Sequence, residues 1–283
     1  MPLPSADEFQ EKHKTLAAAD YLLQYRIPPE PGYSLLVGPP GRGKTNLAFQ
    51  LGCDIQNGLP HLGIPTKQGK VGVILFEGGS NLTERIEKLK KKYGAGNLFD
   101  IDQWPIGELH SLKHKLIEAC KGYNLIILDP FNKFNYGDMT RTMDMQANVR
   151  MLDEVATKAD VHLLVLHHVR KRGNDPKYVL RPRDIDDIKG ATELVGGSLT
   201  AMLLADETQD DLRAMGLAHQ RGAPALRGPD YSMLHFLRAQ ASPEDLESIG
   251  LYFDRAKLEF RRSGGLNMIS TAPPMLMVNT VGP

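Results

Sequence analysis

GPPGRGKT, residues 38–45, stands between the apolar run SLLV at residues 34–37 and the helix-like segment NLAFQLG at residues 46–52. It fits the phosphate-loop pattern of glycine, four residues and then Gly-Lys-Thr. The glycines let the backbone curl so that successive N–H groups face phosphate oxygens, and the helix that follows adds its positive end. The stretch therefore predicts a strand, a phosphate-binding loop and a helix, in that order.

Two side chains of this loop have expected roles in holding a nucleotide. Lys44 is expected to reach the β and γ phosphates, and Thr45 to offer its hydroxyl to Mg²⁺. The residues expected to form the whole nucleotide grip are Gly38, Pro39, Pro40, Gly41, Arg42, Gly43, Lys44, Thr45 and Asn46.

Short apolar runs recur along the chain and alternate with longer mixed segments. They cover residues 34–37, 71–76, 125–128, 161–166 and 200–204. Apolar residues at helical spacing around residues 149–156 predict a crossover helix between two of these runs. Near-continuous apolar strands separated by helices are typical of a parallel sheet buried on both faces, so the sequence predicts a doubly wound α/β fold.

Three parts of the chain are expected. Residues 1–31 form an arm, with a helix from the capping-box spacing at SADE to about residue 25 and a proline-rich connector, IPPEPGY. Residues 32–262 form the main domain, in which GLAHQ, YSMLHFL and LYFDRAKLEFRR predict short strands or hairpin arms. Residues 263–283 form a tail without periodicity, for which disorder and docking are equally expected.

Composition limits the functional class. Thirty-four basic residues balance thirty-four acidic ones, so bulk charge does not hold the chain to nucleic acid and only local patches could do so. Two cysteines without metal-type spacing and no leader-like start predict a reducing, cytoplasmic setting. No apolar run approaches the length of about 18 residues that a membrane helix needs.

Two carboxylates stand where predicted strands end. LIILDP, residues 125–130, ends its apolar run on Asp129, which is expected to hold Mg²⁺ together with Thr45. VILFEGG, residues 73–79, closes on Glu77, which is expected to activate the attacking water as a general base. A solvated carboxylate at a strand end is the alternative for each.

LHHVRK, residues 166–171, brings two histidines to the carboxyl edge of the predicted sheet, where ligands bind in open α/β folds. One of them is expected to contact the γ phosphate. Adjacent residues of a strand face opposite sides, so a structural role is the alternative for the other. A metal site is not favoured, because no cysteine or carboxylate stands at ligand spacing.

The segment that follows, residues 170–189, is too long and too polar for an ordinary connector. Seven basic residues face four aspartates in it, which suits contact with a phosphate backbone. A solvated mobile loop explains the same composition.

GPPGRGKT, the strand ending at Glu77, ILDP at Asp129, and LHHVRK followed by KGATELVGGSLTAMLL together resemble RecA-like P-loop ATPases close to the RepA-type hexameric replicative helicases, which are related to DnaB-type helicases. The resemblance covers residues 25–240. It implies a mostly parallel twisted sheet flanked by helices, with ATP and Mg²⁺ as cofactors. It assigns Glu77 as the catalytic base and His168 as a γ-phosphate sensor.

The same resemblance implies a homo-oligomeric ring, commonly a hexamer. AHQRGAP, residues 218–224, looks like the stretch that reaches a neighbour's nucleotide, so Arg221 would act in trans. His219 stands where a lysine is usual, which puts a second contact in doubt, and a surface arginine is the alternative for Arg221. The catalytic set implied is Glu77, Lys44, His168 and Arg221.

Single-stranded DNA would meet the loops at residues 130–143 and 170–189. The first loop contains Lys133, Phe134, Tyr136 and Arg141, a basic and aromatic mixture that could stack bases. Core packing explains Phe134 equally well. The leading hypothesis is thus a ring DNA helicase; a non-motor RecA-like ATPase that acts as a recombination mediator or switch, and a small-molecule phosphotransferase, stay open.

Overall fold

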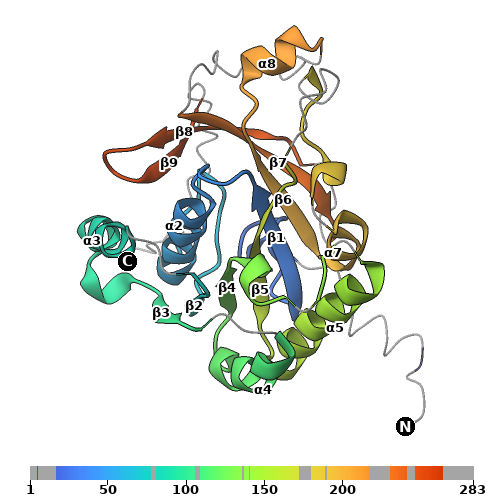
Figure 1. The fold of residues 1–283 in the computed structure, drawn as a ribbon. Coiled ribbons are helices and arrows are strands. Elements are labelled where there is room, and N and C mark those ends of the chain that lie inside the picture. The colour runs from blue at the N-terminus through green and yellow to red at the C-terminus, as the bar shows by residue number, and fades with distance from the viewer. Residues whose placement is uncertain are drawn as a thin grey trace, which may run out of the picture.

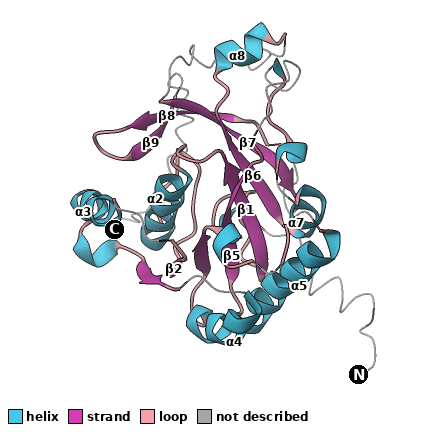
Figure 2. Ribbon diagram, viewed as in Figure 1, coloured by secondary structure: helices cyan, strands magenta, loops and turns pink. Residues whose placement is uncertain are grey.

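The computed structural model describes residues 5, 17–77, 81–105, 109–135, 137–139, 141–171, 180–188, 190–216, 230–240 and 246–263. These residues form one nine-stranded sheet in the order β3-β2-β4-β5-β1-β6-β7-β8-β9. Figure 2 shows the sheet at the centre with helices on both sides. The strands are β1 (Gly32–Gly38), β2 (Val71–Leu75), β3 (Asp100–Gln103), β4 (Leu125–Asp129), β5 (His162–His168), β6 (Thr200–Ala205), β7 (Tyr231–Ala239), β8 (Ile249–Asp254) and β9 (Glu259–Arg262).

Helices cover both faces of the sheet (Figure 1). One face carries α2 and α3, and the other carries α4, α5 and α7. The α-helices are α2 (Lys44–Asn57), α3 (Leu82–Tyr93), α4 (Leu109–Cys120), α5 (Thr142–Ala159), α7 (Ala191–Gly197) and α8 (Gln209–Ala214). The short 3-10 helices are η1 (Ala18–Asp20), η2 (Ala95–Asn97), η3 (Phe131–Lys133) and η4 (Ile185–Asp187).

The six strands from β3 to β6 in the sheet order pair in parallel, and β7, β8 and β9 continue the sheet as antiparallel strands. Strands β1, β2 and β4 are buried at every position, because helices cover both of their sides. The predicted α/β fold, the five apolar strands and the crossover helix, which is α5, are therefore confirmed.

Two parts of the prediction differ from the structure. Strand β3 was missed because its four residues, DIDQ, are all exposed and have no apolar run. The expected exposed helix up to residue 25 is wrong in its described part: after η1, Leu22 and Leu23 are buried against the α2 face of the sheet, and Leu23 bridges Thr66. Burial of this apolar pair decides the backbone there over local helix propensity.

Strands β8 and β9 form the hairpin predicted from LYFDRAKLEFRR, and YSMLHFL lies in β7. Residues 217–220 of GLAHQ and residues 264–283 of the tail lie outside the described part of the chain. The division of the chain at residues 31 and 262 stays a prediction. Because β8 runs antiparallel to β7, its end and the hairpin turn return to the edge where the parallel strands end. This edge carries the candidate site.

Candidate nucleotide-binding site

The phosphate loop forms the turn from β1 into α2. Gly38 ends β1, and Lys44 is the first residue of α2. Gly41 and Gly43 have φ angles of 76° and 85°, which side chains rarely tolerate, so the glycines of the pattern are required by the backbone. The loop thus has the geometry in which N–H groups and the positive end of α2 face an anion.

Lys44 lies folded along this loop. Its amine donates to the carbonyl oxygens of Gly38 and Pro39, each at 2.9 Å, and lies 3.2 Å from Nδ1 of His168. Burial lowers the pKa of Lys44 to about 8, against an opposite effect of the Asp129 carboxylate. A phosphate anion would stabilise the charged form of this buried amine more than the neutral carbonyl oxygens do.

Thr45 and Asp129 meet across the start of α2. The hydroxyl of Thr45 donates to a carboxylate oxygen of Asp129 at 2.6 Å. Burial raises the pKa of Asp129, and the Thr45 hydrogen bond and the charge on Lys44 act in the opposite direction. A hydroxyl and a buried carboxylate are the hard oxygen donors that Mg²⁺ takes, so this pair fits the expected metal once nucleotide phosphates complete its shell.

In the described part of the chain, no three His, Cys, Asp or Glu side chains lie close enough together to bind a metal without a nucleotide.

Glu77 follows β2 at the same edge of the sheet. Its side chain is 55% exposed and lies 3.7 Å from the amine of Lys133. Its charge contributes to the raised pKa of Asp129, so the two carboxylates are near each other.

The two histidines at the end of β5 point to opposite sides, as adjacent strand residues do. His167 is fully buried and its ring packs edge-on against Phe131, with centroids 5.3 Å apart. His168 faces the phosphate loop, where its Nδ1 lies beside the Lys44 amine. Because Lys44 donates, Nδ1 acts as an acceptor there.

The loop after β4 decides between the two alternatives left open for Phe134. Phe134 is fully buried, with ring centroids 4.4 Å from Phe76 and 5.3 Å from Phe131. Core packing is therefore its role, and this ring does not stack bases. Arg141 is 70% exposed on its side chain, and Tyr136 lies outside the described residues.

Some basic residues of the loop after β5 form ion pairs within the molecule. Arg181 is paired with Asp184 and Asp187. Arg183 donates to Asp206 at 2.7 Å, and its side chain is 8% exposed. Residues 172–179 and 189 lie outside the described part, as does Arg221. Arg170 and Lys171 leave the end of β5 at the carboxyl edge.

The family model described as AAA domain matches residues 3–174, which is more than half of the chain. The chain belongs to the AAA domain family. Among curated proteins, no sequence matches this AAA family member significantly.

Solved structures share its fold at low sequence identity. The ATPase domain of G40P matches with a TM-score of 0.55 and 13% identity, over 82% of this chain and 84% of that one. A DnaB-like replicative helicase matches with a TM-score of 0.56 and 13% identity, over 92% and 67%. The RadB recombinase matches with a TM-score of 0.50 and 14% identity, over 82% and 90%. The AAA family member thus has the fold of the RecA-like P-loop ATPases.

Sequence reasoning missed the partner of the phosphate loop. Phe260 of β9 lies against Gly43: a Cβ added to this glycine would come within 2.9 Å of the phenyl ring. Gln50 of α2 fixes the strand, since its Nε2 donates to the Phe260 carbonyl at 3.0 Å and its Oε1 accepts from the Phe260 N–H at 2.9 Å. The hairpin of this AAA family member is therefore a wall of the phosphate loop.

Within the parts of the chain that the structure describes, no helix combines the length and the apolarity that a bilayer crossing requires. Cys53 and Cys120 are free thiols buried in the core, and burial raises the pKa of each to about 12. Both therefore act as packing residues.

Proposed function

We propose that this protein hydrolyses ATP with Mg²⁺ and works as a RecA-like ring motor on single-stranded DNA, as a replicative DNA helicase does. The observation that carries the proposal is the contact between Thr45 and Asp129 at 2.6 Å beside the buried amine of Lys44. This contact joins the phosphate loop to a strand-end carboxylate, which a purely structural glycine turn does not need.

The residues of the site divide the work of phosphoryl transfer. Lys44 exchanges its loop carbonyls for the β and γ phosphates, while Thr45 and Asp129 hold Mg²⁺. When bound, Mg²⁺ supplies neutralisation of the charge that develops on the phosphates. Glu77 orients the attacking water, and its exposed carboxylate at the sheet edge leaves room for that water.

His168 is proposed to sense the γ phosphate. Its Nδ1 contacts the Lys44 amine, so a phosphate that draws Lys44 away would leave this histidine able to turn to the phosphate oxygens. One residue, Val169, separates His168 from Arg170 and the long basic loop. A change at its ring can therefore pass to residues 170–189.

A homo-oligomeric ring, proposed as a hexamer, would bring Arg221 of one subunit to the nucleotide of the next. Likeness in fold to the ATPase domain of G40P and to a DnaB-like replicative helicase supports this part of the proposal. The loops at residues 130–143 and 170–189 follow β4 and β5 at one edge of the sheet, which is where a strand of DNA would meet both.

The decisive experiment measures ATP turnover with and without single-stranded DNA, together with strand displacement on a forked duplex and the mass in solution. We expect an oligomer whose turnover rises with DNA and which separates the fork. Asp129→Asn serves as the inactive control. A monomer that DNA neither binds nor stimulates would refute the ring motor.

A non-motor RecA-like ATPase, such as a recombination mediator, is the second candidate. It is favoured by the internal pairing of Arg181 and Arg183, which lowers the charge that the long loop offers to DNA. The match to the RadB recombinase over 90% of that chain is consistent with it. Stimulation of turnover by DNA without displacement of the fork would decide for this candidate.

A further inference from the structure

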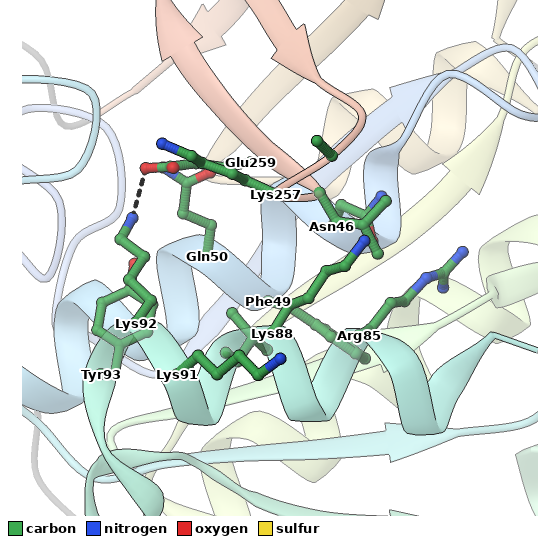
Figure 3. Close-up of a pocket in the computed structure, with 13 residues that line it drawn as sticks. Asn46, Phe49, Gln50, Arg85, Lys88, Lys91, Lys92, Tyr93, Lys257 and Glu259 are labelled. Carbon is green, nitrogen blue, oxygen red and sulfur yellow. Dashed lines mark hydrogen bonds and ion pairs between the residues drawn. The ribbon is translucent and has the colours of Figure 1, made fainter.

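A basic cavity lies beside the phosphate loop, between α2, α3 and the turn of the β8–β9 hairpin (Figure 3). Its volume is 400 Å³, which suits a small ligand. Phe49, Leu89 and Leu258 give it apolar walls, and Asn46 places it one residue beyond Thr45. Five cationic side chains and one carboxylate line it: Arg85, Lys88, Lys91, Lys92, Lys257 and Glu259.

The cations of α3 form a ladder that starts at the phosphate site. Arg85, Lys88 and Lys92 follow the spacing i, i+3, i+7, which puts them on one face of the helix. At 1.5 Å per residue, they stand about 4.5 Å and about 6 Å apart along the axis. Arg85 is close enough to Asp129 to act on its pKa. In Figure 3, Lys88 extends from α3 toward Asn46.

These cations are only partly neutralised by carboxylates. Lys88 pairs with Glu84 and Lys92 with Glu259, each at 2.7 Å, and one member of each pair is more than a third exposed, so solvent weakens both pairs. Five cations against one carboxylate leave the lining with many more hydrogen-bond donors than acceptors, so the cavity suits a ligand rich in oxygen atoms.

We propose that the ribose of a nucleotide held by the phosphate loop enters this cavity, and that Lys88, Lys91 and their neighbours bind an additional phosphate on that ribose. The inference rests on the proposed function only in placing the 5′ phosphates at Lys44. Lysine and arginine side chains offer donors and no acceptors, which matches phosphate oxygens. The ladder continues past the 5′ phosphates. Its further cations can therefore bind a second phosphate, at a spacing that a nucleotide phosphorylated at two ribose positions can reach.

The test compares AMP with adenosine 3′,5′-bisphosphate and adenosine 2′,5′-bisphosphate on the full chain, by displacement of ADP in a calorimeter. Exposed cation–phosphate pairs are individually weak, so several acting together are expected to tighten binding about tenfold for at least one bisphosphate. The advantage is expected to vanish in the double variant Lys88→Ala, Lys91→Ala. Lys90→Ala is the matched control, because Lys90 lies on α3 outside the cavity and pairs with Glu87.

Glu259→Gln gives a test of opposite sign. It removes the one carboxylate of the lining and frees Lys92, so it is expected to tighten bisphosphate binding by a few fold more than it tightens AMP binding. Equal affinities of AMP and both bisphosphates would overturn the inference, as would an advantage that survives the double variant. ATP turnover measured on the same samples separates this failure from a failure of the proposed function.

Discussion

The two halves of the sheet achieve their stability in different ways. Strands β1, β2 and β4 are buried at every position between helices, and the candidate site residues stand at the ends of these apolar runs. The antiparallel half is partly exposed, and its hairpin of β8 and β9 reaches the site through a contact of Phe260 with Gly43 and two hydrogen bonds between Phe260 and Gln50. The parallel half carries the proposed catalytic side chains, whereas the antiparallel half shapes their surroundings.

This difference teaches where the site is vulnerable. Changes at the parallel edge should affect binding and turnover without unfolding the protein, because the side chains there end the strands and do not fill the core. Changes at the docked hairpin should affect stability first and the nucleotide second. Three substitutions, one control substitution and a change of pH test this division.

Lys44→Ala has the largest expected effect. The variant loses the cation that meets the phosphates, so ATP turnover should fall by about 10³-fold. The free energy of unfolding should hold or rise slightly, because a buried amine with its pKa lowered to about 8 is removed. Steady-state turnover and urea titration of the same preparation measure both. A strongly destabilised variant would break the division between the two halves.

Phe260→Ala is the corresponding test of the antiparallel half. The phenyl ring is 1% exposed and packs against Phe253 and Gly43, so its loss should lower the free energy of unfolding by about 3 kcal/mol. ADP affinity should fall as well, since the loop loses its wall. Denaturant titration and calorimetry measure the two effects.

Tyr252→Ala is the control for Phe260→Ala, because Tyr252 lies in the same hairpin and is 36% exposed. We expect a loss below about 1 kcal/mol for it. If Phe260→Ala destabilises the protein but leaves ADP affinity at the wild-type value, the hairpin is a structural extension and not a part of the site.

Glu77→Gln sharpens the comparison within the parallel edge. The amide keeps the shape of the side chain but cannot take a proton, so turnover should fall about 10²-fold while ATP still binds. Single-turnover hydrolysis and ATP binding by calorimetry separate these effects. Wild-type turnover in Glu77→Gln would remove this residue from the role of base.

The pH dependence of ADP binding is the smallest expected effect. Burial places the pKa of Lys44 near 8, and bound phosphates raise it, so binding above pH 8 takes up a proton. Affinity should therefore be constant up to about pH 8 and then decrease by up to tenfold per pH unit. ADP phosphates are fully ionised there and add no slope of their own. Calorimetry in buffers of different ionisation enthalpy would detect the proton, and a flat profile to pH 9.5 would contradict the assignment.

Most of the parallel half could be predicted from the sequence. Its strands are apolar runs, the glycines of its phosphate loop indicate positive φ angles, and Glu77 and Asp129 stand at strand ends. Strand β3 could not be predicted, because DIDQ joins the sheet by backbone pairing and buries no side chain. Phe134 could not be assigned either, since an aromatic residue in a loop has the same pattern whether it stacks a base or fills the core.

The docked hairpin could not be predicted for a different reason. Gln50 and Phe260 are 210 residues apart in the chain, and neither belongs to a spacing pattern that points to the other. The cations of α3 belong to the segment LTERIEKLKKKY, whose charged composition is also that of a solvated helix face. Only the turn of β8 and β9 opposite the ladder makes it a cavity.

The separation between Gln50 and Phe260 also affects the order in which the protein folds during synthesis. A ribosome delivers the chain from its amino end, at about 5–20 residues per second, so residues 38–45 emerge some ten seconds or more before Phe260. Until β9 has left the ribosome, the phosphate loop lacks its wall and Gln50 of α2 lacks its partner. Nascent chains should therefore acquire tight nucleotide binding only after β9 has emerged.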